Sequence, residues 1–120
     1  MSAARAKGTL AERLVANYLT TVGWPYAERR AMAGSNDRGD ITGTPGIVWE
    51  IKSGARLSLP EWMRETEQER KNAGAHTGVL VVKPRGMGAA QVGEWWSVMP
   101  LRVTARLLAV DEGIYETEPN

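Results

Sequence analysis

Two β-branched apolar segments separated by one helical segment constrain the fold of this chain more than any other feature. Residues 47–52 and 78–83 have the composition of strands, and the second is apolar enough to be buried on both faces. Between them, a capping-box serine at Ser58 and a stop glycine at Gly74 predict a helix over Leu59–Ala73. A strand, a helix and a second strand in this order predict an α/β domain.

The segments on either side add helices and strands to this unit. Apolar residues recur at helical spacing from Ala4 to Val22, which predicts an amphipathic helix, and Glu12 falls just beyond the edge of its apolar face. We therefore expect a three-layer α/β fold with a mixed central sheet flanked by helices. The other expected elements are a short strand within 24–31, a polar loop over 33–39, a β-hairpin of 40–42 with 47–52, a glycine-rich loop after Pro84, a strand over 95–99 and a helix that begins after Pro100.

Length and composition limit the classes of protein that the chain can belong to. With 120 residues it has the size of one domain with one modest core. No apolar run reaches the roughly 18 residues that cross a bilayer, so we expect a cytoplasmic protein without a membrane partner. There is no cysteine and a single histidine, so a catalytic metal would have to be held by carboxylates. Carboxylate ligands favour Mg²⁺ or Mn²⁺.

The charge of the chain is distributed unevenly. The net charge is +1, but four of the fourteen acidic residues fall after position 110, where there is no Lys or Arg. Residues 1–110, which we take as the domain, therefore carry a net charge of about +5, which is compatible with contact to phosphate. We expect residues 111–120 to form a poorly ordered acidic tail.

The most informative chemical pattern is Asp40 followed, after nine residues, by Glu50-Ile51-Lys52. A hairpin can bring Asp40 beside Glu50, and the alternation of side chains along a strand puts Lys52 on the same face as Glu50. Asp40, Glu50 and the backbone carbonyl of Ile51 could then hold a divalent cation against a phosphodiester, while Lys52 orients or deprotonates the attacking water or stabilises the transition state.

With these residues the chain resembles the PD-(D/E)XK nucleases, and within them the archaeal-type Holliday junction resolvases and their phage relatives. The resemblance keeps its order and spacing over residues 7–52, and the later helix and strand agree with the fold. One departure is Gly39, which stands where the family usually has proline. The motifs that carry the resemblance are Lys7-Gly8, Glu12-Arg13, Arg29-Arg30, Ser35, Asp40-Ile41 and Glu50-Ile51-Lys52.

The resemblance implies a restriction-endonuclease-like fold and Mg²⁺-dependent cleavage of branched DNA. In it Glu12 completes the metal site, Ser35 belongs to a catalytic loop, and a homodimer presents two active sites to opposite strands of a four-way junction. Contacts to the DNA backbone are expected from basic residues around the site. These candidates are Lys7, Arg29, Arg30, Arg38 and Arg56.

Each assignment has a plainer alternative. Ser35 can simply shape a turn, Arg38 and Arg56 can be solvated charges, and only one of two successive strand arginines faces a given surface. Gln68 resembles a glutamine that some of these nucleases place near their site, although its acidic and basic neighbours look like an exposed, paired face. Other functions also stay open: cleavage of flap, single-stranded or duplex DNA, or a catalytically inactive DNA-binding or assembly protein with the same fold. His76 is interpreted as a loop residue, and of Trp95 and Trp96 one is expected in the core and the other on the surface.

Overall fold

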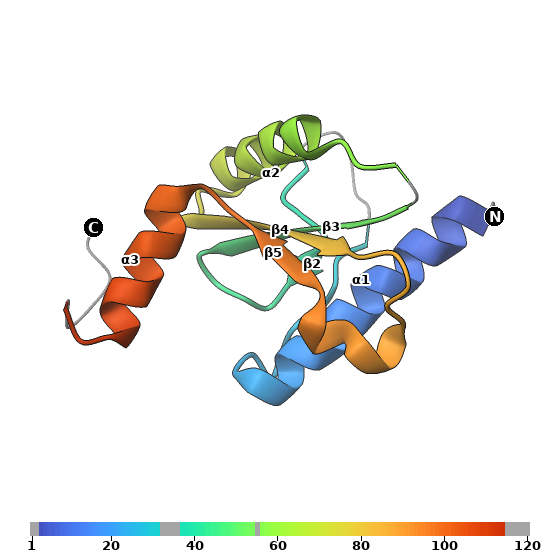
Figure 1. The fold of residues 1–120 in the computed structure, drawn as a ribbon, viewed down its shortest axis with the longest axis horizontal. Coiled ribbons are helices and arrows are strands. Elements are labelled where there is room, and N and C mark those ends of the chain that lie inside the picture. The colour runs from blue at the N-terminus through green and yellow to red at the C-terminus, as the bar shows by residue number, and fades with distance from the viewer. Residues whose placement is uncertain (1–2, 32–36, 55, 115–120) are drawn as a thin grey trace.

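The computed structural model describes residues 3–31, 37–54 and 56–114 (Figure 1). In chain order the elements are α1 (Ala3–Val22), β1 (Glu28–Arg29), β2 (Ile41–Thr42), β3 (Ile47–Ser53), α2 (Leu59–Ala73), β4 (Thr77–Lys83), the 3-10 helix η1 (Ala89–Glu94), β5 (Trp96–Val98) and α3 (Leu101–Asp111). The predicted strand-helix-strand unit is thus confirmed as β3, α2 and β4.

A mixed sheet forms the centre of the molecule. β3 and β4 run parallel, from Ile47 opposite Thr77 to Ser53 opposite Lys83. β5 joins the other edge of β4 in the antiparallel direction, so the strand order is β3-β4-β5. The sequence-based expectation of a mixed central sheet is confirmed.

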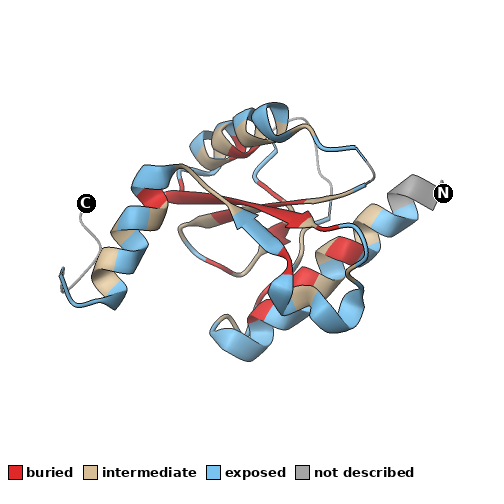
Figure 2. Cartoon of the chain, viewed as in Figure 1, coloured by how far each residue is buried: buried red, intermediate tan, exposed pale blue. Residues whose placement is uncertain are grey.

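Helices cover both faces of this sheet (Figure 1), as expected for a layered α/β domain. On the α1 face, Val15 and Leu19 pack with Ile51, Val79 and Val81 in one buried cluster. Figure 2 shows that burial concentrates along β3, β4 and the inner side of α1. Alternation along β3 and β4 sends the intervening residues toward α2.

The α2 face is distinguished by a close approach of helix to strand. A side chain at Gly78 of β4 would meet Thr66 of α2, since an ideal Cβ would lie 3.2 Å from Thr66 Cγ2. Thr66 is 2% exposed, and Leu80 of β4 is fully buried. The absence of a side chain at Gly78 therefore allows α2 to lie directly on the sheet.

The expected hairpin between 40–42 and 47–52 is wrong in its strand pairing. β2 pairs with β1, with Arg29 opposite Ile41, while a single backbone hydrogen bond from Asp40 N to Trp49 O (2.8 Å) ties the start of β2 to β3. The turn between β2 and β3 closes on itself, because Ile47 N donates to Thr44 O and Thr44 Oγ1 donates to Ile47 O. Those bonds occupy groups that a regular hairpin ladder would use.

The C-terminal third differs from expectation in one element. The glycine-rich stretch after Pro84 contains η1. Trp95, which follows η1, donates from Nε1 to the carbonyl of Gly88, which precedes it. Trp95 is 7% exposed and Trp96 53% exposed, so the prediction of one core and one surface tryptophan is confirmed. Asp111, the first residue of the expected tail, is the last residue of α3, and residues 115–120 lie outside the described part of the chain. Among the described helices, none combines the length and apolar character that a membrane span requires.

Candidate active site

Asp40 and Glu50 form the centre of the candidate site. Asp40 immediately precedes β2, and its carboxylate oxygen Oδ2 accepts a hydrogen bond from Ile51 N (2.7 Å), which fixes the side chain against β3. Glu50, in the middle of β3, is only 6% exposed, and its carboxyl group lies within hydrogen-bonding range of Asp40. The structure therefore brings together the two carboxylates that the sequence pattern singles out.

This pair is strongly perturbed electrostatically. Burial, the hydrogen bond with Glu50 and the Glu50 charge raise the pKa of Asp40 to about 9, against a smaller lowering by the Ile51 amide. Burial is also the main cause that raises the pKa of Glu50 to about 8. Two carboxylates this close and this buried favour a shared proton or a cation, because both groups only accept hydrogen bonds when ionised.

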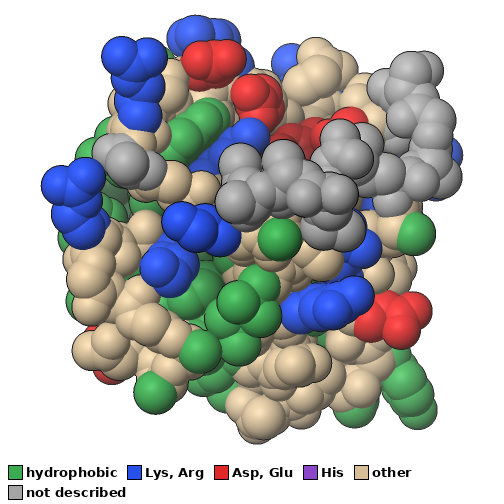
Figure 3. Space-filling model, turned by 90° about the vertical axis from the view of Figure 1, so that its right-hand side faces the viewer, with side chains coloured by type: hydrophobic (Ala, Val, Ile, Leu, Met, Phe, Trp, Pro, Cys, Tyr) green, Lys and Arg blue, Asp and Glu red, His purple; other side chains and the backbone are tan. Residues whose placement is uncertain are grey.

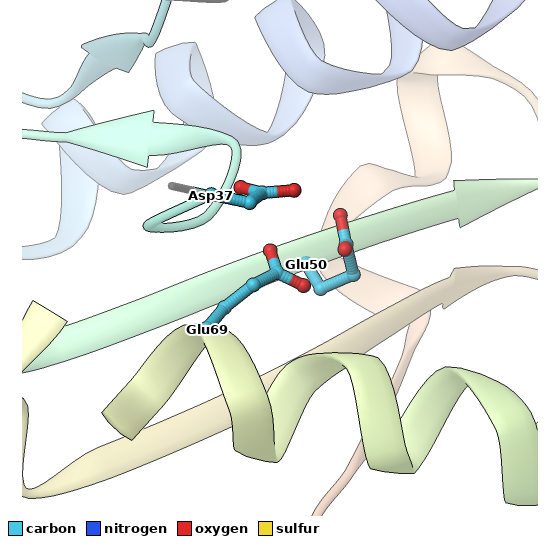
Figure 4. Close-up of side chains that lie close together, drawn as sticks. All are labelled: Asp37, Glu50 and Glu69. Atoms are coloured by element: carbon cyan, nitrogen blue, oxygen red, sulfur yellow. The ribbon is translucent and has the colours of Figure 1, made fainter. Parts of the chain in front are cut away.

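Two further carboxylates, Asp37 and Glu69, join the pair although the sequence analysis did not assign them. Asp37 lies in the loop before β2 and Glu69 in α2, and together with Glu50 they offer oxygen atoms that all lie within 4.8 Å of one another. Figure 4 shows the three side chains converging from the loop, β3 and α2. Burial and the charges of Asp37 and Asp40 raise the pKa of Glu69 to about 7.

Glu12 approaches the pair from α1. Burial and the charge of Asp40 raise the pKa of Glu12, while a hydrogen bond from Arg29 opposes that shift. Arg29 Nε lies 2.9 Å from Glu12 Oε1, so Arg29, expected to contact DNA, is engaged with Glu12. A helix carboxylate is thus near Asp40, as the family resemblance implies, but it already has a cationic partner.

Lys52 lies two residues after Glu50 on β3. Its ammonium group is 2.8 Å from Glu65 Oε2 of α2 and 6.0 Å from the centre of the Trp62 ring. Burial lowers the pKa of Lys52, but the hydrogen bond with Glu65 and the charges of Glu50 and Asp40 outweigh this effect and raise it overall. Lys52 is therefore protonated at neutral pH and is attracted electrostatically to Glu50 and Asp40.

The other expected DNA contacts differ in exposure. Lys7, Arg38 and Arg56 are exposed, whereas Arg30 is half-buried and its Nε has no hydrogen-bond partner among the described residues. Lys7 lines a groove of about 350 Å³ that also contains Lys83 and Arg85 and lies between α1 and the carboxyl ends of β3 and β4. Ser35, the expected catalytic-loop residue, lies outside the described residues.

Two residues that the sequence left open have ordinary structural contacts. Gln68 is exposed and its Nε2 donates to Asn72 Oδ1 on the next turn of α2 (3.0 Å). His76, in the loop between α2 and β4, bonds the neighbouring Thr77 hydroxyl through Nδ1. His76 is therefore a loop residue, as interpreted from the sequence.

A signal for Glu69 was present in the sequence. Trp62, Thr66 and Glu69 follow each other at spacings of four and three, which puts all three on one side of a helix. Glu69 stands in a run of charged residues, which is typical of a solvated helix face. Its position on the same side of the helix as Trp62 and Thr66 nevertheless buries it. Asp37 had no comparable signal, since aspartate is common in turns.

Comparison with known proteins adds no identification: no family model, curated protein or solved structure matches this chain.

Proposed function

We propose that this chain is a divalent-metal-dependent endonuclease of the PD-(D/E)XK type that cleaves branched DNA, with four-way junctions as its main substrate. The observation that carries the proposal is the Asp40–Glu50 carboxylate pair, in which Glu50 is 6% exposed, with Lys52 two residues after Glu50 on β3. Buried carboxylates with raised pKa values concentrate at functional sites, because such an arrangement costs stability unless a ligand compensates it.

The donor set fits Mg²⁺ or Mn²⁺. Asp40 and Glu50 are the ligands that the sequence pattern names, Glu12 is a third carboxylate near Asp40, and the backbone carbonyl of Ile51 is a further oxygen on β3. A bound cation of this kind neutralises charge on the scissile phosphate and acidifies the attacking water. The role of the protein is to hold these oxygens in place, which the Ile51 amide does for Asp40.

Lys52 supplies the positive charge that the pattern requires. Its protonated ammonium can leave the ion pair with Glu65 when substrate binds, and can then bind a phosphate oxygen or orient the attacking water. The side chain of Glu65 is 40% exposed, so water can replace Lys52 as its partner at little cost.

The groove that Lys7 lines supports an anionic polymer as substrate. The groove between α1 and the ends of β3 and β4 is lined by Lys7, Lys83 and Arg85 and by no acidic residue. Figure 3 shows the face at which α1 begins, where Lys and Arg side chains lie on either side of hydrophobic ones and acidic side chains lie nearer the edges. Basic side chains of this kind bind phosphates without reading bases, so selectivity for branched DNA would rest on shape and on the expected homodimer.

A cleavage assay tests the proposal. Four-way, flap, single-stranded and linear duplex DNA are each incubated with the protein and Mg²⁺ or Mn²⁺, with and without chelator. We expect chelator-sensitive cleavage that is fastest on four-way DNA. Cleavage of the other substrates at equal rates would exclude the junction specificity, and no metal-stimulated cleavage of any substrate would favour an inactive DNA-binding protein.

The variant Glu50→Gln separates chemistry from binding. It should abolish cleavage while DNA affinity is kept or increased, because it removes a ligand and a negative charge near the phosphate. Glu67→Gln is the matched control, since Glu67 lies on α2 but pairs with Arg70 outside the carboxylate cluster. Equal activity of Glu50→Gln and the wild type would refute the assigned site.

A further inference from the structure

Glu69 is a buried carboxylate without a hydrogen-bond donor. It is 3% exposed, and neither of its carboxylate oxygens has a hydrogen-bond partner within the described ranges. Glu50 is near enough to share a proton with Glu69, but two ionised carboxylates cannot bond to each other. A buried charge in this state is costly unless a cation compensates it.

The neighbouring basic side chains are engaged elsewhere. Lys52 pairs with Glu65 at 2.8 Å, and Arg70, one residue after Glu69, donates to Glu67 and to the carbonyl of Ala75. Burial is the main cause that raises the pKa of Glu69, and the charged groups that raise it further, Asp37 and Asp40, are acidic. Among the described residues, no basic side chain is therefore paired with Glu69 itself.

The loop that carries Asp37 is fixed to the same helix. Asn72, one turn after Glu69, donates from Nδ2 to the backbone carbonyl of Asp37 (2.9 Å), and Gly39 N donates to Asp37 Oδ1 (2.9 Å). These two bonds hold Asp37 above Glu50 and Glu69 in the arrangement of Figure 4. The fold therefore fixes the position of Asp37 relative to the other two carboxylates.

We propose that Asp37, Glu50 and Glu69 form a second divalent-cation site, which shares Glu50 with the site at Asp40. The spacing fits, because oxygens that bind one ion at metal–oxygen distances of about 2.0–2.6 Å lie at most about 4–5 Å apart, and these lie within 4.8 Å of one another. A shared carboxylate is the arrangement by which two cations are held roughly 3.5–4 Å apart for phosphoryl chemistry. The role in cleavage rests on the proposed function, but the binding of the cation does not.

The test counts cations directly. Calorimetric titration of the wild-type chain with Mn²⁺ should give two sites per chain. Glu69→Gln should leave one, or weaken the second by more than about 100-fold, which exceeds the roughly 10–100-fold that the loss of a supporting group costs. Glu67→Gln, on the same helix but outside the cluster, should behave as the wild type. The rise in thermal midpoint on adding Mn²⁺ should also be smaller in Glu69→Gln than in both other proteins.

Several outcomes decide the matter. Unchanged Mn²⁺ affinity and stoichiometry in Glu69→Gln would overturn the second site and would favour a proton shared between Glu50 and Glu69. If Glu69→Gln does not fold, Asp37→Asn decides by the same measure, because Asp37 is exposed and asparagine can still accept the Gly39 hydrogen bond.

Cleavage separates this inference from the proposed function. Two Mn²⁺ ions without cleavage of any DNA would refute the nuclease and keep the second site. Metal-dependent cleavage with unaltered Mn²⁺ binding in Glu69→Gln would support the nuclease and refute the second site.

Discussion

Replacing Glu69 with Gln in the metal-free protein should increase the free energy of unfolding at neutral and alkaline pH but not at acid pH. The reason is that Glu69 is 3% exposed and its carboxylate has no described hydrogen-bond donor, so ionisation of this side chain opposes folding. Glutamine has nearly the same shape and no charge. Its amide can also donate a hydrogen bond to Glu50, which the carboxylate cannot do.

The magnitude follows from the pKa of Glu69. Folding raises it from 4.5 to about 7, so the folded state binds more protons than the unfolded chain between these values. The wild type therefore loses stability as the pH rises through this window, and at roughly 1.4 kcal/mol per pKa unit the loss reaches about 3 kcal/mol above pH 7. Glu69→Gln does not titrate, so its advantage should grow from near zero at pH 4.5 to about this value.

The assay is urea-induced unfolding at several pH values with a chelator present. Glu67→Gln is the control: its pKa is lowered by the hydrogen bond with Arg70, so its loss should cost less than about 1 kcal/mol at neutral pH and bring no gain. A difference between Glu69→Gln and the wild type that does not vary with pH, or that favours the wild type at pH 8, would refute the reasoning.

Three other substitutions give separate expectations. Lys52→Met should reduce DNA cleavage by about 10²-fold or more with little change in DNA affinity, because it removes the charge proposed to act on the water or phosphate; gel assays of cleavage and binding check this. Gly39→Ala should destabilise the protein by about 1–3 kcal/mol in chemical unfolding, because Gly39 has φ +97° and an added Cβ would lie 2.8 Å from Val48 Cγ1. Gly54→Ala is the control and should cost less, because no atom lies near the position of its added Cβ. Leu80→Ala, at a fully buried position, should cost about 2–5 kcal/mol, and Leu101→Ala, at an exposed one, less than about 0.5 kcal/mol.

The elements that the sequence predicted best are those with clear start and stop signals at their ends. α2 spans Leu59–Ala73 as expected, because Gly74 adopts the left-handed conformation (φ 64°) and its amide caps the last turn. The predicted capping box at the other end forms only in part, since Ser58 Oγ bonds the Glu61 carboxylate instead of a backbone amide. Strong stop signals and β-branched composition are local properties, and local properties are visible in one sequence.

The pairing of β2 and the membership of Glu69 in the site depend on tertiary contacts instead. In the turn before Ile47, the Thr44 hydroxyl and the backbone groups bond to each other instead of to a neighbouring strand. No pattern in the sequence indicates that β2 pairs with β1 and not with β3. The Asp40–Glu50 pair was predictable because two short-range rules, strand alternation and a connecting turn, suffice to bring its members near each other. Glu69 and Asp37 reach the same place only through the packing of α2 on the sheet.

That packing gives an unusual importance to a residue without a side chain. Since Gly78 sets how near α2 lies to β4, it also sets how deeply the Glu69 carboxylate is withdrawn from water. A methyl group at position 78 would push α2 away from the sheet and so expose the Glu69 carboxylate to water. The distance between α2 and β4 therefore helps to set the pKa of the Glu69 carboxyl, although Gly78 makes no contact with it.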